Sequence, residues 1–272
     1  MKLLTRIKQY LSPESMVEIV ALGHQKSGTT AIATLLGEIS GWKSSSVEPL
    51  YGMDMGPGKI ADKIMQDPQK LNYYCHRYPK YFGHRILKDT DLIFVYPEVK
   101  RLFKKAKFIF IIRDPRDTIR SICNRLGLPG DHSSASMRPD DMKSPTRHWE
   151  LIMSSRLPQI PGIKVEFSNY IVNLANRWKL ATNIYQEDKD NFVLIKYEDF
   201  IMDKEGSIAN LARSLNLPVS HSISHLVDVQ YQRKGDSNVD WLTFFGQENI
   251  KMVEEICKKE MKEFSYEPYS IE

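Results

Sequence analysis

Residues 17–30 read VEIVALGHQKSGTT, and this stretch decides the fold of the chain. Its first part, 17–22, is short, apolar and rich in β-branched residues, which is typical of a buried parallel strand. Residues 27–30 are small and polar, and they open a helix that is predicted over 31–39. Small residues let the backbone approach a ligand closely, and the free N–H groups at a helix start favour an anion. With the added charge of Lys26, the stretch predicts a seat for phosphate or sulfate.

The stretch is not a Walker A loop, which has Gly, four residues, Gly, then Lys and Ser or Thr. Gly23 and Gly28 have the required spacing, but Thr29 stands at the position of the lysine. Lys26 comes two residues before the second glycine instead. The alternative interpretation is an ordinary strand-to-helix turn with a solvated lysine.

Length and composition exclude several classes of protein. A chain of 272 residues with 42% hydrophobic residues suits one large α/β domain or two small ones. The net charge of +4 is too small to indicate nucleic-acid binding, although a local basic cleft fits it. The 3 cysteines are widely spaced, which argues against a zinc site or a disulfide framework and favours a reducing compartment. No signal peptide or transmembrane segment is visible, so we expect a cytoplasmic protein.

Strand and helix signals alternate along the rest of the chain. Residues 107–112 form the strongest buried-strand signal, and Pro115 begins a helix that is predicted to run to about Leu126. Further strands are expected at 81–87 and 191–196, and helices at 60–67, 91–105, 169–187, 205–215 and 247–262. This alternation predicts an α/β domain with a central parallel sheet of about four or five strands between helices.

Arg113 ends the strand 107–112, where a Walker B strand would end in the Asp that holds magnesium. An arginine at the carboxyl edge of a strand, beside a helix start, can meet an anion in the crevice. Ser121 lies about two helical turns further on, and Arg125 lies one turn past it, so all three can share a face. Arg116 and Arg120 of the same helix are expected to be solvated.

Four motifs in this order resemble those of sulfotransferases that use 3′-phosphoadenosine 5′-phosphosulfate (PAPS). The first, Lys-Ser-Gly-Thr-Thr after a strand, resembles the 5′-phosphosulfate loop and is formed by Lys26, Ser27, Gly28, Thr29 and Thr30. The spacing of Arg113 and Ser121 resembles the element that holds the 3′-phosphate of PAPS. Arg125 resembles an arginine of tyrosylprotein sulfotransferases.

The other two motifs lie in the last third of the chain. Tyr197, in Tyr-Glu-Asp-Phe, resembles a family tyrosine that lies near the nucleotide. Arg233, Lys234 and Gly235, followed by Asp-Trp, resemble the loop that closes on the 3′-phosphate. The chain departs from the family pattern at Ala31, where cytosolic members usually carry a Trp that contributes to the adenine pocket.

The resemblance implies a single P-loop-like sulfotransferase domain over 1–272 and the transfer of a sulfuryl group from PAPS by in-line displacement. The acceptor would be a hydroxyl or amine of a small molecule, a carbohydrate or another hydroxyl-bearing compound. Adenosine 3′,5′-bisphosphate would be the product, and no metal or nucleic acid is required. Lys26 would neutralise charge on the leaving phosphate oxygen, and Lys88 would stabilise the transferred group.

A general base must take the proton of the acceptor, and three residues are candidates. Glu48 lies about where tyrosylprotein sulfotransferases carry a glutamate, and it ranks first. His84 lies near the position of the catalytic histidine of cytosolic members, and Asp89 is the third candidate. The loop-like segments 41–58 and 127–168 would form the acceptor pocket, with 127–168 as a lid insertion that contains two candidate contacts, Trp149 and Phe167.

Two other functions compete with sulfuryl transfer. A nucleotide-dependent kinase on a related fold would need the Gly-Lys-Ser/Thr sequence and the strand-end Asp that this chain lacks. A non-catalytic module would bind adenosine 3′,5′-bisphosphate without transferring any group. Magnesium-independent transfer would separate the first competitor from a sulfotransferase, and transfer to any acceptor would exclude the second.

Overall fold

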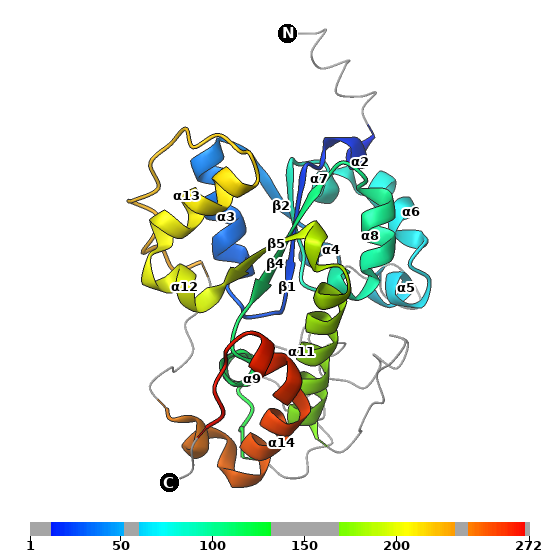
Figure 1. The fold of residues 1–272 in the computed structure, drawn as a ribbon. Helices are drawn as coiled ribbons and strands as arrows, with labels where there is room; N and C mark the ends of the chain where they lie inside the picture. Colours follow the sequence, from blue (N-terminus) through cyan, green and yellow to red (C-terminus); the bar gives the residue numbers. More distant parts are fainter. Residues whose placement is uncertain (1–11, 52–59, 132–168, 232–238, 270–272) are drawn as a thin grey trace, which may run out of the picture.

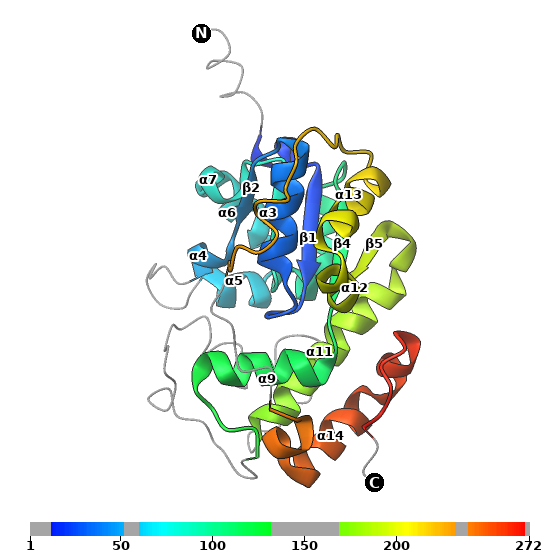
Figure 2. The ribbon, with the colours of Figure 1, turned by 90° about the vertical axis from the view of Figure 1, so that its left-hand side faces the viewer.

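The computed structural model describes residues 12–51, 60–131, 169–231 and 239–269. Its central sheet has 5 parallel strands in the order β2-β3-β1-β4-β5. Helices cover both faces of this sheet, as Figures 1 and 2 show. The predicted three-layer α/β fold is therefore confirmed. The strands are β1 (Ile19–Gly23), β2 (Ser44–Ser46), β3 (Ile86–Lys88), β4 (Lys107–Ile112) and β5 (Phe192–Lys196).

The two central strands set the position of the site. β1 and β4 pair in parallel from Ile19 opposite Lys107 to Gly23 opposite Ile111. The chain therefore leaves both strands at the same edge and at nearly the same level. A crevice outside the carboxyl ends of central parallel strands is where open α/β sheets bind their ligands.

The apolar run of each central strand feeds two cores, because successive side chains point to opposite faces. The core shared with α3 (Thr29–Ser40) and α13 (Lys204–Ser214) takes Ile19, Ala21, Ile109 and Ile111. The core on the other face, which includes side chains of α8 (Tyr96–Leu102) and α11 (Tyr170–Glu187), takes Val20, Leu22, Phe108 and Phe110. Burial on both faces explains why these strands read as continuous apolar sequence.

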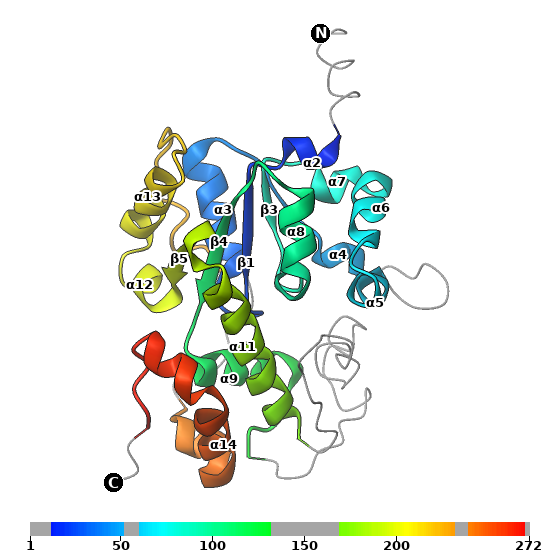
Figure 3. The ribbon, with the colours of Figure 1, turned by 45° about the vertical axis from the view of Figure 1, so that its right-hand side comes forward.

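Two further helices lie beyond the carboxyl edge of the sheet, where Figure 3 shows them beside the lower half of α11. They are α9 (Pro115–Leu126) and α14 (Trp241–Glu263), which is kinked at Gly246. The remaining helices are α2 (Pro13–Met16), α4 (Glu48–Tyr51), α5 (Ile60–Gln66), α6 (Lys70–Arg77), α7 (Pro79–Phe82), η1 (Leu92–Val95), η3 (Lys189–Asn191) and α12 (Tyr197–Met202). None of the helices described is both long and apolar enough to cross a membrane.

The structure differs from the sequence prediction at several places, and three of them lie in or next to β2 and β3. Residues 44–46, expected in a loop, form the edge strand β2 beside β3. The strand expected at 81–87 covers only Ile86–Lys88, because 79–82 forms helix α7. The helix expected at 91–105 is divided at Tyr96, and Pro97 lies in the first turn of α8, where its missing N–H leaves no bond unmade. Most of the expected lid, including Trp149 and Phe167, lies outside the described residues.

Candidate functional site

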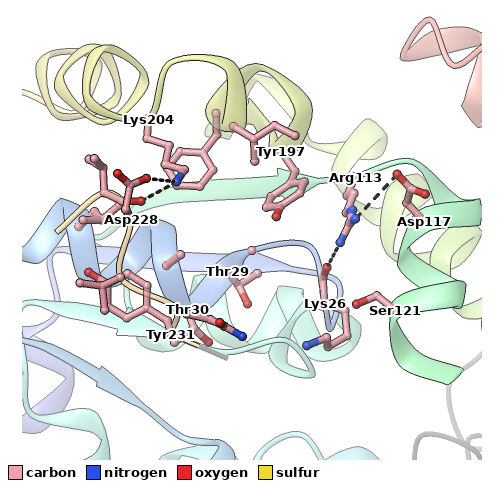
Figure 4. Close-up of a pocket in the computed structure, with 18 of the residues that line it drawn as sticks. Lys26, Thr29, Thr30, Arg113, Asp117, Ser121, Tyr197, Lys204, Asp228 and Tyr231 are labelled. Carbon is pink, nitrogen blue, oxygen red and sulfur yellow. Dashed lines mark hydrogen bonds and ion pairs between the residues drawn. The ribbon is translucent and has the colours of Figure 1, made fainter. Parts of the chain in front are cut away.

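A cavity of about 610 Å³ lies at the carboxyl edge of the sheet, and residues far apart in the sequence line it (Figure 4). The loop after β1 contributes Lys26 and the start of α3, and the segment after β4 contributes Arg113. Tyr197, the first residue of α12, also lines the cavity. The sequence-predicted residues that share this cavity are Lys26, Gly28, Thr29, Thr30, Arg113, Ser121 and Tyr197. Ser27 is fully buried and does not line it.

The loop between β1 and α3 has an unusual backbone. Lys26 has a φ of 66° and Gly28 has a φ of 81°, both in the left-handed region. A Cβ at Gly28 would lie 2.5 Å from Cδ2 of Tyr197, so this position requires glycine for space as well as for conformation. The loop leads directly into α3, whose first N–H groups have no partners within the helix. This arrangement suits a bound anion.

Arg113 joins the two sides of the cavity. Its Nη1 donates a hydrogen bond of 3.0 Å to the main-chain oxygen of Lys26, 87 residues away in sequence. Its guanidinium carbon lies 4.5 Å from the centre of the Tyr197 ring, a cation–π contact. Its Nη2 lies 3.8 Å from a carboxylate oxygen of Asp117. Figure 4 shows these partners around the guanidinium.

Positive charge gathers around Lys26. Burial, followed by the charges of Arg125 and Arg113, lowers the pKa of its amine from 10.5 to about 8. Arg125 does not line the cavity, but it lies close enough to act on Lys26 through charge. A cluster of cations that repel one another stores electrostatic free energy, which a bound dianion releases.

A buried polar network supports the loop from behind. The side chain of Gln25 donates a 2.7 Å hydrogen bond from Nε2 to Oδ1 of Asp91, and its Oε1 accepts one of 3.3 Å from Nε of Arg177. Arg177 also pairs directly with Asp91. His24 stacks on the ring of Trp178, and burial lowers its pKa to about 3, so the imidazole is neutral. Sequence reasoning missed Arg177 as a site neighbour, because a single arginine in an amphipathic helix gives no signal.

Glu48 and Lys88 meet at the same edge of the sheet, after β2 and at the end of β3. Nζ of Lys88 lies 2.5 Å from Oε1 of Glu48, and Thr90 Oγ1 donates to the same oxygen at 2.9 Å. Lys88 is buried, and Glu48 keeps about a quarter of its side chain exposed. Neither residue lines the cavity of Lys26 and Arg113. These strands adjoin β1, and the contact between Gln25 and Asp91 joins the loop after β3 to the loop that carries Lys26.

The other two candidate bases lie in different surroundings. Asp89 is fully buried, and its Oδ1 accepts the N–H groups of Asp91 and Leu92, so it shapes the turn that begins η1. Burial and the nearby Asp91 raise the pKa of Asp89 well above its usual range. His84 precedes the first residue of β3, at the amino edge of the sheet. Counting along the strand, this is roughly 20 Å from the end of β1, and the structure does not bring His84 to the cavity.

The expectation that Arg116 and Arg120 are solvated is wrong. Arg116 is 2% exposed and pairs with Asp114 and Glu254, with its guanidinium 3.9 Å from the centre of the Trp241 ring. Arg120 is 7% exposed, donates to the main-chain oxygen of Val239 and pairs with a carboxylate on its own helix. Arg116 therefore joins α9 to α14, and Arg120 joins α9 to the segment just before α14.

The predicted loop residues Arg233, Lys234 and Gly235 lie outside the described residues. The chain on either side of them is placed at the cavity. Tyr231 lines it, and Val239 is bonded to Arg120, which lines it too. The far end of the cavity, which the sequence did not reveal, includes Lys204, Asp228 and Tyr231 (Figure 4).

Comparison with known proteins identifies the family. The sequence model described as "Sulfotransferase family" matches residues 57–221, more than half of the chain. The matched part contains Arg113 and Tyr197, whereas the Lys26 loop lies before it. No curated protein matches the sequence. Two solved structures have the same fold. The sulfotransferase STF1 from Mycobacterium tuberculosis H37Rv has a TM-score of 0.53 and 13% identity, over 93% of this chain and 80% of that chain. The sulfotransferase STF9 from Mycobacterium avium has a TM-score of 0.56 and 13% identity, over 97% of this chain and 81% of that chain. This chain belongs to the sulfotransferase family.

Proposed function

We propose that this protein transfers a sulfuryl group from PAPS to a hydroxyl or amine of an acceptor, by in-line displacement and without a metal. The observation that carries the proposal is the meeting of Lys26 and Arg113 in one cavity, joined by the 3.0 Å bond between their loops. Two separated cationic groups at the walls of one pocket suit a ligand that carries two separated phosphate groups.

The residues present fit the nucleotide. The cavity of about 610 Å³ falls in the range of small-molecule sites. The N–H groups at the start of α3, together with Thr29 and Thr30, would hold the 5′-phosphate. Arg113 and Ser121 would hold the 3′-phosphate, and Arg125 would add charge. When bound, PAPS supplies an activated sulfuryl group attached to a bisphosphate leaving group.

Lys26 would stabilise the negative charge that develops on the leaving oxygen. Its amine lies at the cavity wall and is held by a loop whose main chain is fixed by Arg113. A donor that is already in place where charge develops contributes about 3–4 kcal/mol to the barrier reduction. The ammonium form is the active one, so this contribution depends on the protonation of Lys26.

Glu48 would act as the general base that takes the proton of the acceptor. The two described hydrogen bonds of its carboxylate converge on Oε1, which leaves Oε2 to face an acceptor. Lys88 and Thr90 would hold the carboxylate in place, and Lys88 would also neutralise charge on the transferred group. The acceptor class that we propose is a small hydroxyl-bearing compound or a carbohydrate, which would enter from the side of β2 and α4.

The test uses the purified chain with ³⁵S-labelled PAPS and pooled acceptors, in the presence of a chelator, and calorimetric binding of adenosine 3′,5′-bisphosphate. We expect transfer to at least one acceptor pool without added magnesium, and binding of the bisphosphate. Lys26→Met should abolish transfer and retain most of the binding. Arg113→Met should weaken the bisphosphate far more than adenosine 5′-phosphate. Equal loss for both nucleotides would contradict the role of Arg113, and binding without any transfer would favour a non-catalytic module.

A further inference from the structure

The left-handed backbone of Lys26 needs an explanation. A φ of 66° is rare for a residue with a side chain, and such a conformation persists only where the surroundings determine it. Lys26 is also the residue whose amine position matters most for the proposed transfer. The contacts of its neighbours in the chain show what holds it.

On one side of Lys26, the preceding residue is fixed. Gln25 is 5% exposed, and its amide is held at both ends by Asp91 and Arg177, at 2.7 and 3.3 Å. Arg177 is itself 1% exposed and lies 4.2 Å from the centre of the Phe94 ring. A buried polar network whose hydrogen bonds are satisfied is rigid. The ion pair of Asp91 and Arg177 therefore fixes the side-chain amide of Gln25.

On the other side, the partner of Lys26 is fixed by the same helix. The main-chain oxygen of Lys26 accepts from Arg113, and the main-chain oxygen of Arg113 accepts a 2.9 Å hydrogen bond from the indole Nε1 of Trp178. The ring of Trp178 also stacks on His24, two residues before Lys26. Consecutive residues of α11, Arg177 and Trp178, therefore reach the two loops that form the cavity.

We infer that Arg177 and Trp178 are positioning residues, which hold the Lys26 loop and Arg113 in register with each other from the buried side of the site. This inference rests on the proposed function for its catalytic consequence. Neither side chain lines the cavity. Their effect on turnover would pass through Gln25 for the lysine and through the main chain of Arg113 for the arginine.

The first test is Gln25→Met, which removes both hydrogen bonds of the side-chain amide and leaves the ion pair between Asp91 and Arg177 intact. We expect kcat to fall about ten- to a hundredfold, because a small displacement of a catalytic group has an effect of this size. The KM for PAPS should change little. The pKa of Lys26, measured in the protein without nucleotide from the pH dependence of its acylation followed by peptide mass mapping, should move from about 8 towards 10.5.

The second test is Trp178→Phe, which keeps the ring and removes only the indole N–H. The preference for adenosine 3′,5′-bisphosphate over adenosine 5′-phosphate should fall about two- to tenfold, the value of one neutral hydrogen bond. The matched control is Asn169→Ala, which removes the side-chain cap of α11 but touches neither loop. It should lower the melting temperature and leave the pKa, kcat and nucleotide preference unchanged.

The inference is overturned if Gln25→Met and Trp178→Phe behave as Asn169→Ala does, with a lower melting temperature and no change in the three readouts. The pKa of Lys26 requires no nucleotide, so it tests the inference even if the wild-type chain does not bind PAPS. A wild-type chain that does not bind PAPS would refute the proposed function and leave this inference standing. Should Gln25→Met fail to fold, Trp178→Phe still decides between a positioning role and a purely structural one.

Discussion

The lowered pKa of Lys26 predicts how kcat/KM for PAPS depends on pH. Its pKa of about 8 in the free protein means that the amine is mostly ammonium well below pH 8, half neutral at about pH 8, and mostly neutral well above it. Since the ammonium is the form that binds and neutralises phosphate oxygens, kcat/KM for PAPS should fall as the pH rises through about 8. An unperturbed lysine would keep its charge to about pH 10.

The same profile measured at saturating PAPS should differ. A bound nucleotide brings phosphate charges beside Arg113 and Arg125, which then lower the pKa of Lys26 less than they do in the free protein. The profile of kcat reports the complex, whereas kcat/KM reports the free enzyme. We therefore expect the alkaline limb of kcat to lie at a higher pH than that of kcat/KM.

Arg125→Gln gives the sharpest form of this prediction. The total drop in the pKa of Lys26 is from 10.5 to about 8, burial is the largest cause, and Arg125 comes next, ahead of Arg113. Removing the charge of Arg125 should thus restore less than half of the drop, moving the alkaline limb of kcat/KM upward by about one pH unit or less. Lys70→Gln, which removes an exposed cation on α6, is the control and should leave the limb in place. A limb that stays at the same pH in Arg125→Gln, or moves downward, would refute the electrostatic account of Lys26.

Substitutions at four other residues test separate parts of the structure. Tyr197→Ala should raise the Kd for adenosine 3′,5′-bisphosphate about fivefold in calorimetry, the value of a cation–π contact of about 1 kcal/mol with Arg113, whereas Tyr197→Phe should match the wild type. Gly28→Ala should lower the free energy of unfolding by about 1–3 kcal/mol in urea titrations, because its φ is 81° and the new Cβ would lie 2.5 Å from the Tyr197 ring. Glu48→Gln should lower kcat about 10²–10⁴-fold with unchanged PAPS binding, and a normal kcat would exclude it as the base. Arg116→Met should destabilise the fold by about 3–5 kcal/mol, because it leaves the buried carboxylate of Asp114 and the partly buried one of Glu254 without a cation, and a melting temperature equal to the wild type would contradict this.

The parts of the fold that the sequence predicted well are those that local chemistry determines. The strand 107–112 and the helix from Pro115 to Leu126 have the predicted bounds. A run of apolar residues buried on both faces, followed by a proline that suits a first helical turn, leaves little choice of structure. The loop from Lys26 to Thr30 was placed for the same reason, because small residues after a buried strand have few alternatives.

The parts that the sequence did not predict depend on neighbours from elsewhere in the chain. Ser44–Ser46 has no apolar signal, and it becomes a strand because β3 offers an open edge. Arg116 is expected to be solvated from the sequence alone, because its partner Glu254 lies 138 residues later in the chain. The spacing to other motifs predicted that His84 lies near the site. In the structure it lies before β3, at the amino edge of the sheet, whereas the cavity lies at the carboxyl edge.

The loops that carry Lys26 and Arg113 lie far apart in the sequence, but the pairing of the strands before them fixes the distance between them. β1 and β4 are paired through five consecutive positions, Ile19 to Gly23. A shift of one residue in that register would turn the apolar side chains of a strand to the wrong faces, so the core of the protein enforces it. The same register brings Arg113 level with the loop of Lys26, where α11 fixes both from behind. The spacing of the two cationic groups is therefore set by core packing, and this explains how a loop with a left-handed lysine can hold the amine of Lys26 in place.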